Sequence, residues 1–537
     1  MRGMMMNSPL TLPVILERAR QIYPKTEVVS RMPDKSLHRY TYADFYKRAR
    51  QLAEGLQKAG LRKGERVATL MWNHYAHLEA YFGIPCSGGV LHTLNLRLHP
   101  DDLAFIANHA GDRFLVVDDV LLPLLDKFQA RAKFEKIFVV PLTGKPVPAG
   151  YENYEALLSS ATGAFEYPQL DESDALGMCY TSGTTGKPKG VVYSHRSTVL
   201  HCFAVALADG VGMTCRDAVL PVVPQFHANA WGIPFACVMV GSKQVFPGPH
   251  LDPESCLDLF EREKVTVAAG VPTVWGGILA MLDSAPERWK LQRGMRMVIG
   301  GSAAPESMIR AFDKHGLHIY HAWGMTETSP LGTMAVLKGS HLEAGADAQY
   351  AARAKQGMPS PFVEIRAIGD AGEIPWDGAA VGELQVRGPW IAAGYYNPEE
   401  GESKWTTDGW FRTGDVVSID ADGYMKITDR TKDLIKSGGE WISSVDLENA
   451  LASHPAVREA AVIAVPHPKW AERPLAVVAL KPGATATAAD LSAFLAAKFA
   501  KFWVPEAYAF VEAVPKTSVG KYNKMALREQ YPSWKWE

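Results

Sequence analysis

Helix-like and strand-like segments alternate along most of this chain, and this alternation restricts the possible folds more than any other feature of the sequence. Residues 42–59 have the spacing of an amphipathic helix, and a β-rich run follows at 66–72. Further β-rich runs occur at 113–118, 265–270, 296–301 and 318–323. Each run ends at a polar or glycine-rich segment, which is where open parallel sheets bind ligands. The pattern predicts an α/β fold.

After residue 357 the sequence pattern changes from alternating helix-like and strand-like segments to short strand-like segments separated by turns. Turns that contain glycine or aspartate separate short β-rich segments at 362–368, 382–387, 416–419 and 424–427. These hairpins predict a small β subdomain. A polar stretch at 428–433 suits a linker, and a compact α+β pattern follows it.

The 537 residues are too many for a single hydrophobic core. We expect a large N-terminal domain over residues 1–431, made of layered α/β subdomains plus the β subdomain. A small α+β C-terminal domain is expected over residues 432–537.

The overall composition is that of an ordinary globular protein, with 47% hydrophobic residues and 56 basic against 58 acidic side chains. This balance gives no electrostatic reason to expect nucleic acid or an anionic membrane as a partner. No apolar run reaches membrane-spanning length, so we expect a cytoplasmic protein without integral membrane association. The six cysteines include no Cys-x-x-Cys pair, which favours reduced thiols over a zinc site.

Residues 181–190 read Thr-Ser-Gly-Thr-Thr-Gly-Lys-Pro-Lys-Gly, a composition that suits a polyphosphate better than a core. Glycines let a backbone turn present N–H groups to phosphate oxygens, lysines add positive charge, and hydroxyls add donors or a metal ligand. A flexible surface loop is the alternative, but the strand-like flanks at 175–180 and 191–193 favour a phosphate loop. Pro188 and the spacing exclude the Walker pattern. The candidate nucleotide-binding residues here are Thr181, Ser182, Gly183, Thr184, Thr185, Gly186, Lys187 and Lys189.

This loop closely resembles the phosphate loop of the acyl-adenylate-forming (AMP-binding) superfamily, which includes acyl-CoA synthetases, peptide-synthetase adenylation domains and firefly luciferase. A second segment, Ala-Trp-Gly-Met-Thr-Glu-Thr at 322–328, resembles the Gly-x-Thr-Glu motif of that superfamily. Alone, the Thr-Glu pair is typical of a helix cap. The resemblance implies that Glu327 binds Mg²⁺ together with Thr184, and that Thr326 lies beside the α-phosphate.

Within the same segment, the resemblance implies that Trp323 stacks on adenine, with Gly324 and Met325 beside the nucleotide. The superfamily more often has tyrosine at this position, and tryptophan stacks at least as well but has no hydroxyl. The turn at 300–305 is similar to the adenine-side loop, which would place Gly301, Ser302 and Ala303 near the nucleotide and the base of the acyl pocket.

The remaining motifs lie toward the C-terminus. Residues 410–415 resemble the Thr-Gly-Asp motif, in which the acceptor-only carboxylate of Asp415 would bind both ribose hydroxyls. Arg430 matches the arginine that also reaches the ribose, and Lys432 matches the hinge of a mobile C-terminal domain; without the resemblance this stretch is a solvated charge run. The motif residues still to be assigned are Gly438 and Gly439, which match the pantetheine tunnel loop, and Lys521, which matches the catalytic lysine of the motif at 515–521.

The stretch 221–232 resembles the acyl-pocket wall of the superfamily, where His227 would approach the carboxylate or the adenylate. A lone histidine among apolar residues is otherwise typical of a core. Trp231 resembles the tryptophan that gates the fatty-acyl tunnel of bacterial fatty-acyl-CoA synthetases; the alternative is a core aromatic. We find no charged residue in these surroundings, which favours an apolar acid. The candidate substrate-pocket residues are His227, Trp231, Val271, Gly301 and Ala303.

The resemblance as a whole implies an ATP-dependent acyl-CoA synthetase that uses Mg²⁺, forms an acyl-AMP with release of pyrophosphate, and transfers the acyl group to CoA. In detail the chain looks most like the bacterial branch of fatty-acyl-CoA synthetases and 3-methylmercaptopropionyl-CoA ligases. A ligase that loads a carrier protein and a luciferase-type oxygenase remain as alternatives, a nucleotide-binding pseudoenzyme is disfavoured, and a homodimer is left open.

Overall fold

The computed structural model of the chain describes residues 1–537 except 2, 182–186, 399–403, 438–439, 519 and 537. Its first sheet has seven strands, and every neighbouring pair is parallel except the last, which is antiparallel. In spatial order these strands are β7 (Glu152–Asn153), β6 (Lys136–Val140), β5 (Asp112–Asp118), β3 (Arg66–Leu70), β4 (Val90–Thr93), β8 (Ala175–Tyr180) and β9 (Gly190–Ser194).

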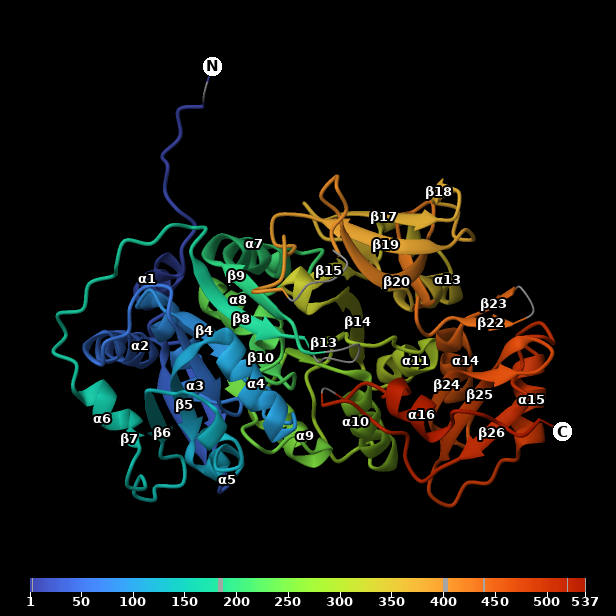
Figure 1. Ribbon diagram of the computed structural model, residues 1–537, viewed down its shortest axis with the longest axis horizontal. Coiled ribbons are helices and arrows are strands. Elements are labelled where there is room, and N and C mark those ends of the chain that lie inside the picture. The colour runs from blue at the N-terminus through green and yellow to red at the C-terminus, as the bar shows by residue number, and fades with distance from the viewer. Residues whose placement is uncertain (2, 182–186, 399–403, 438–439, 519, 537) are drawn as a thin grey trace.

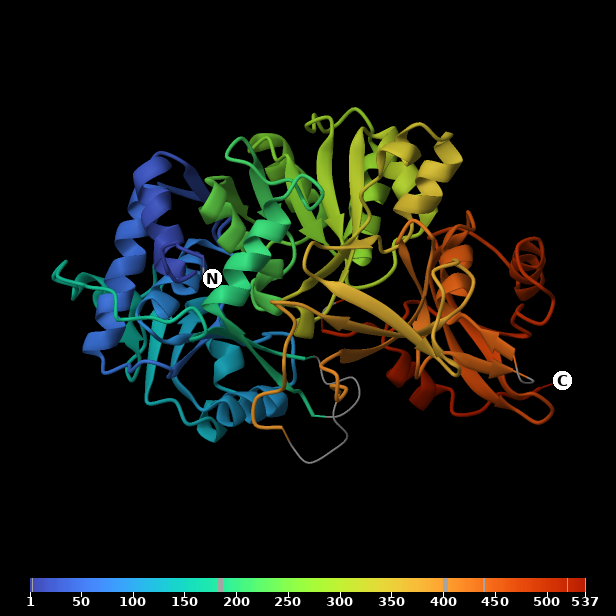
Figure 2. The same ribbon diagram turned by 90° about the horizontal axis from the view of Figure 1, so that it is seen from above.

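A second, nine-stranded sheet lies beside the first (Figure 2). Its strands are β16 (Met358–Pro359), β15 (Leu331–Met334), β14 (Leu317–Gly324), β13 (Met295–Ile299), β12 (Val267–Gly270), β10 (Ala218–Pro221), β11 (Lys243–Phe246), β1 (Glu27–Arg31) and β2 (Leu37–Thr41). The central run from β14 to β1 is parallel, and the outer pairs at both edges are antiparallel. The alternation seen in the sequence therefore builds two α/β layers, as predicted.

Helices pack on and between these two sheets. They are α1 (Leu12–Ile22), α2 (Tyr42–Lys58), α3 (Tyr75–Cys86), α4 (Pro100–Ala110), α5 (Leu122–Leu125), α6 (Tyr154–Ser159), α7 (His195–Ala206), α8 (Ile233–Val240), α9 (Pro253–Arg262), α10 (Pro272–Ser284) and α11 (Glu306–Lys314). The predicted helix at 42–59 is α2, which begins at a capping box between Thr41 and Asp44. One hydrophobic core contains residues of both sheets and of α3 and α8, so the two layers form one body.

The predicted β subdomain is a five-stranded antiparallel sheet. Its strands are β18 (Gly372–Glu373), β17 (Glu364–Gly369), β19 (Gly382–Arg387), β20 (Phe411–Ile419) and β21 (Met425–Arg430), and the short helices α12 (Gly339–Leu342) and α13 (Ala346–Arg353) precede it. The prediction of a linker over 428–433 was wrong for its first half. Strand β21 continues to Arg430 because Arg430 pairs across the ladder with Asp415, which holds these polar residues in the sheet.

The C-terminal part has its own sheet, ordered β23 (Glu440–Ile442), β22 (Ile435–Ser437), β25 (Ala471–Leu480) and β24 (Val457–His467), with β26 (Ala507–Phe510) parallel to β25. Helices α14 (Ser444–Ala452), α15 (Ala488–Ala496) and α16 (Lys524–Gln530) complete it. It lies at the opposite end of the molecule from the seven-stranded sheet (Figure 1). The chain thus has the predicted fold class, a large N-terminal α/β domain with a β subdomain and a smaller α+β C-terminal domain. None of the helices in the described ranges is long and apolar enough to cross a bilayer.

Candidate functional site

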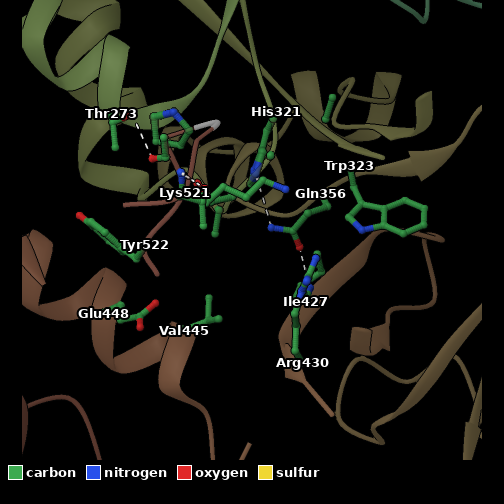
Figure 3. A pocket seen from close by; sticks show the side chains of 18 of the residues that line it. Thr273, His321, Trp323, Gln356, Ile427, Arg430, Val445, Glu448, Lys521 and Tyr522 are labelled. Atoms are coloured by element: carbon green, nitrogen blue, oxygen red, sulfur yellow. Dashed lines mark hydrogen bonds between the residues drawn. The ribbon is translucent and has the colours of Figure 1, made fainter. Parts of the chain in front are cut away.

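A cavity of about 1440 Å³ lies where the nine-stranded sheet, the β subdomain and the C-terminal part meet. The residues that follow β13 and β14 line it, as expected at the carboxyl ends of parallel strands. Figure 3 shows side chains of the β subdomain and of the C-terminal part reaching into the same space. Most of the motif residues singled out in the sequence are therefore brought to one place.

The base of the phosphate loop is closed by its own two ends. The backbone N–H of Thr181 donates to the carbonyl of Lys189 at 2.9 Å, and the N–H of Lys189 donates to the Thr181 hydroxyl at 3.0 Å. Thr181, Lys187 and Lys189 all line the cavity. The other candidates of this loop, Ser182, Gly183, Thr184, Thr185 and Gly186, lie outside the described residues. The two lysines supply positive charge at this end of the cavity.

Glu327 lies on a short 3₁₀ helix (Thr326–Thr328) at the end of β14 and is only 5% exposed. Its Oε1 accepts a hydrogen bond of 2.6 Å from the hydroxyl of Tyr395. Burial and the adjacent Glu327 raise the pKa of Tyr395, so that hydroxyl keeps its proton. A buried carboxylate that lines the cavity is a hard oxygen ligand of the kind that Mg²⁺ takes from proteins, so this residue fits the metal. Sequence reasoning missed Tyr395, which no motif signalled.

The candidate nucleoside residues contact one another directly. The indole N–H of Trp323 donates to Oδ2 of Asp415 at 2.8 Å, and the Arg430 Nε lies 3.1 Å from Oδ1 of the same carboxylate. Asp415 is 3% exposed, and its charge is the main cause that raises the pKa of Arg430. The Trp323 ring lies over Gly332, where a Cβ would come within 2.4 Å of it. Gly324 and Met325 also line the cavity.

The adenine-side turn approaches the C-terminal part closely. Gly301 has φ +86, and a Cβ there would lie 3.3 Å from Cε of Lys521 and 3.4 Å from Val271. Gly301, Ser302 and Ala303 line the cavity. Val271, a candidate pocket residue, is not among the described residues that line it; instead it packs between Gly301 and Gly520.

Lys521 is partly buried and lies in the cavity between Thr273 and Trp323 (Figure 3). Burial, together with the Arg430 guanidinium, lowers the pKa of Lys521 to about 8. Lys432 follows β21 and also lines the cavity, whereas Gly438 and Gly439 lie outside the described residues. The catalytic-lysine candidate thus lines the cavity together with other residues of the C-terminal region, such as Glu448 and Tyr522.

His227 lines the cavity near Lys521 and Arg97. Burial and these two cations lower its pKa to about 3, which keeps the imidazole neutral at physiological pH. A neutral imidazole can offer one N–H to an oxygen in the pocket without adding a charge.

Trp231 stands on an unusual backbone segment. Ala228, Asn229, Ala230 and Trp231 have φ values of 38, 41, 53 and 57, a left-handed turn that costs residues other than glycine about 1–2 kcal/mol each. The buried Asn229 anchors this turn: its Oδ1 accepts hydrogen bonds from Cys179 on β8 at 2.8 Å and from Thr93 on β4 at 3.1 Å. The anchored turn holds the Trp231 ring at the wall of the cavity, close to Gly300. A Cβ added to Gly300 would lie 3.4 Å from this ring.

Comparisons with known proteins bear on what this cavity binds. A family model described as "AMP-binding enzyme" matches residues 16–396, and one described as "AMP-binding enzyme C-terminal domain" matches 446–521. The chain is 50% identical over 534 residues to a long-chain-fatty-acid–CoA ligase of Thermus thermophilus, with 99% of this chain and 97% of that protein covered. It is 45% identical over 537 residues to a 3-methylmercaptopropionyl-CoA ligase of Ruegeria pomeroyi, with 99% of each covered. A crystal structure of the anthranilate CoA ligase AuaEII in complex with anthranoyl-AMP superposes with a TM-score of 0.86 at 26% identity, over 98% of each chain.

Proposed function

Because this chain belongs to the AMP-binding enzyme family, we infer that it is an AMP-forming acyl-CoA synthetase that activates an apolar carboxylic acid. The observation that carries this conclusion is the single cavity in which Lys189, Glu327, Asp415 and Lys521 meet. In this proposal Lys189 binds phosphate and Glu327 binds the metal. Asp415 binds the ribose, and Lys521 acts on the reacting carboxylate.

The acid is proposed to be apolar because of the lining around Trp231. The neighbouring side chains belong to one hydrophobic cluster and line the same cavity: Val205, Val211, Ile233, Val298, Leu331 and Met334. A charged or zwitterionic acid would lose its hydration there without gaining a partner. A fatty or methylthio-alkanoic acid would not.

In the first half-reaction, a carboxylate oxygen attacks the α-phosphorus of ATP, the bond to the bridging oxygen breaks, and pyrophosphate leaves. Lys187, Lys189 and Lys521 line the same cavity, and in this proposal the first two hold the β- and γ-phosphates while Lys521 stabilises charge at the reacting oxygens. Asp415 and Trp323 bind the nucleoside. Catalysis in this step is positioning and charge stabilisation, with no covalent enzyme intermediate.

Glu327, with Thr184, is proposed to hold Mg²⁺, which would neutralise phosphate charge when bound. The neutral imidazole of His227 is placed to donate a hydrogen bond to the acid. Its low pKa means that it does so without pairing with the carboxylate as an ion, which would lower the nucleophilicity of the attacking oxygen.

In the second half-reaction, the CoA thiol attacks the acyl carbon and AMP leaves as the acyl–phosphate bond breaks. Lys521 lies in the cavity between Thr273 and Trp323 (Figure 3), and we propose that it withdraws before the thiol of CoA enters. We propose that residues 432–537 turn about Lys432 as one domain, and that Gly438 and Gly439 then line the path of the pantetheine arm. We propose that this reaction takes place in the cytoplasm.

The test is to supply ATP, Mg²⁺ and saturated acids of graded chain length, with and without CoA, and to measure pyrophosphate and acyl-CoA separately. We expect pyrophosphate release with apolar acids and acyl-CoA only when CoA is present. Pyrophosphate release without any acyl-CoA would favour a carrier-protein ligase, and light emission with a luciferin and oxygen would identify an oxygenase. No pyrophosphate with any acid would overturn the proposal.

A further inference from the structure

The loop that carries Lys521 is a closed turn. The N–H of Thr517 donates to the carbonyl of Lys521 at 2.7 Å, the N–H of Gly520 donates to the carbonyl of Thr517 at 2.9 Å, and the N–H of Lys521 donates to the Thr517 hydroxyl at 3.2 Å. These bonds hold Thr517, Gly520 and Lys521 to one another. They do not set the position of these residues relative to the N-terminal domain, because all of them lie within the segment.

Three side chains of the N-terminal domain hold the outside of this turn. Asn95 donates from Nδ2 to the Ser518 hydroxyl at 3.0 Å, and Arg97 donates to the Ser518 carbonyl at 3.3 Å. Thr273, at the start of α10, donates from its hydroxyl to the carbonyl of Gly520 at 3.3 Å (Figure 3). Donors from two separate elements therefore converge on a loop more than 240 residues away in the chain.

The surface that receives the loop is organised within the N-terminal domain itself. The N–H of Arg97 donates to Oδ1 of Asn95 at 3.1 Å, and the Arg97 guanidinium lies 5.7 Å from the centre of the Phe226 ring. The fit to the loop is close, since a Cβ on Gly520 would come within 3.1 Å of the Thr273 hydroxyl. Because Gly520 also has φ +84, this contact depends on a glycine for two independent reasons.

We propose that Asn95, Arg97 and Thr273 form a socket that positions the Lys521 loop for the adenylation half-reaction. This inference rests on the proposed function. The three residues act through Lys521 and are positioning residues. When the C-terminal domain turns for thioester formation the loop leaves, so the socket stabilises only the first of the two arrangements. Losing it should slow adenylation and leave thioester formation unchanged.

The variants Asn95→Ala and Thr273→Val each remove one donor to the loop. We expect the single-turnover rate of pyrophosphate release to fall about fivefold in each, the effect of one neutral hydrogen bond. The rate of acyl-CoA formation from supplied acyl-adenylate and CoA should equal that of the wild type. Lys145→Ala, which truncates an exposed lysine away from the cavity, is the matched control and should change neither rate.

Ser518→Ala tests the contact from the other side. The double variant Asn95→Ala/Ser518→Ala should lose no more than Asn95→Ala alone, because Asn95→Ala already removes the hydrogen bond to Ser518. Full additivity would show that the two side chains act separately and would overturn the assignment.

Chemical access to Lys521 gives a readout that does not depend on turnover. Undocking exposes this buried amine, so an amine-acylating reagent, followed by mass spectrometry, should modify Lys521 several-fold faster in Asn95→Ala than in the wild type. Equal labelling, an equal fall in both half-reactions, or a raised KM for ATP would refute the socket; the last result would assign Asn95 to nucleotide binding. A wild type that releases no pyrophosphate with any acid would instead refute the proposed function.

Discussion

From the proposed catalytic role of Lys521 we expect the pH dependence of adenylation to follow the ionisation of this amine. Burial and the nearby Arg430 guanidinium lower its pKa from 10.5 to about 8. The shift corresponds to a penalty of about 3 kcal/mol on the charged form. Only the cation stabilises the negative charge that develops at the α-phosphate. For free enzyme, kcat/KM for pyrophosphate release should therefore be constant below about pH 8 and fall about tenfold per unit above it.

The thioester half-reaction should respond in the opposite direction. In the proposed mechanism it does not use Lys521, and its nucleophile is the thiolate of CoA, whose fraction increases with pH, so its rate should rise as the pH is raised. The assay is pyrophosphate release and acyl-CoA formation from supplied acyl-adenylate, each measured between about pH 6 and 10. Lys521→Arg keeps its charge throughout, so it should have a lower plateau but no alkaline fall. A wild-type profile that stays flat to about pH 9.5, or an alkaline fall retained in Lys521→Arg, would refute this reasoning.

Three further outcomes follow from the described contacts. Glu327→Gln removes the negative charge at the proposed metal position, so the Mg²⁺ concentration for half-maximal adenylation should rise about tenfold; an unchanged titration would make Glu327 a structural residue. Trp231→Ala opens the apolar wall, so kcat/KM across an acid series should shift toward longer chains, with each added buried CH₂ worth about 0.8 kcal/mol; an unchanged profile in a folded variant would mean that Trp231 is only core packing. Asn229→Ala and Asn229→Gly lose the same anchor, but alanine keeps the left-handed strain, so thermal unfolding should show the glycine variant about 1–2 kcal/mol more stable; equal stability would show that the turn is unstrained.

The sequence patterns located the strands and the motifs well because both depend on local order. The runs at 175–180 and 382–387 coincide with β8 and β19, and the Gly-x-Thr-Glu segment follows β14 as expected. The contacts between residues of the site could not be predicted from the sequence. Tyr395 is 68 residues from Glu327, and Trp323 is 92 residues from Asp415, and no periodicity encodes such pairings.

The left-handed turn at Ala228–Trp231 could not be predicted from the sequence either, because it also depends on long-range contacts. Three of its four residues have no intrinsic preference for positive φ, and only Asn229 and the following glycine hint at it. The conformation is imposed by the bonds from Asn229 to Cys179 and Thr93, which lie on strands far away in the chain. At this wall of the cavity, contacts between residues far apart in the sequence therefore impose a backbone conformation that the local sequence does not favour.

The hydrogen bond from Trp323 to Asp415 has a consequence for how this lineage can evolve. Tyrosine, which the resemblance described above leads us to expect at this position, has no indole N–H. A single replacement would leave the buried carboxylate short of a donor, a loss of about 1–3 kcal/mol. Replacing either Trp323 or Asp415 alone therefore costs stability. The hydrogen bond to Asp415, as well as the proposed contact with adenine, restricts which residues position 323 can accept. Homologues with tyrosine here should carry a compensating donor near the equivalent aspartate.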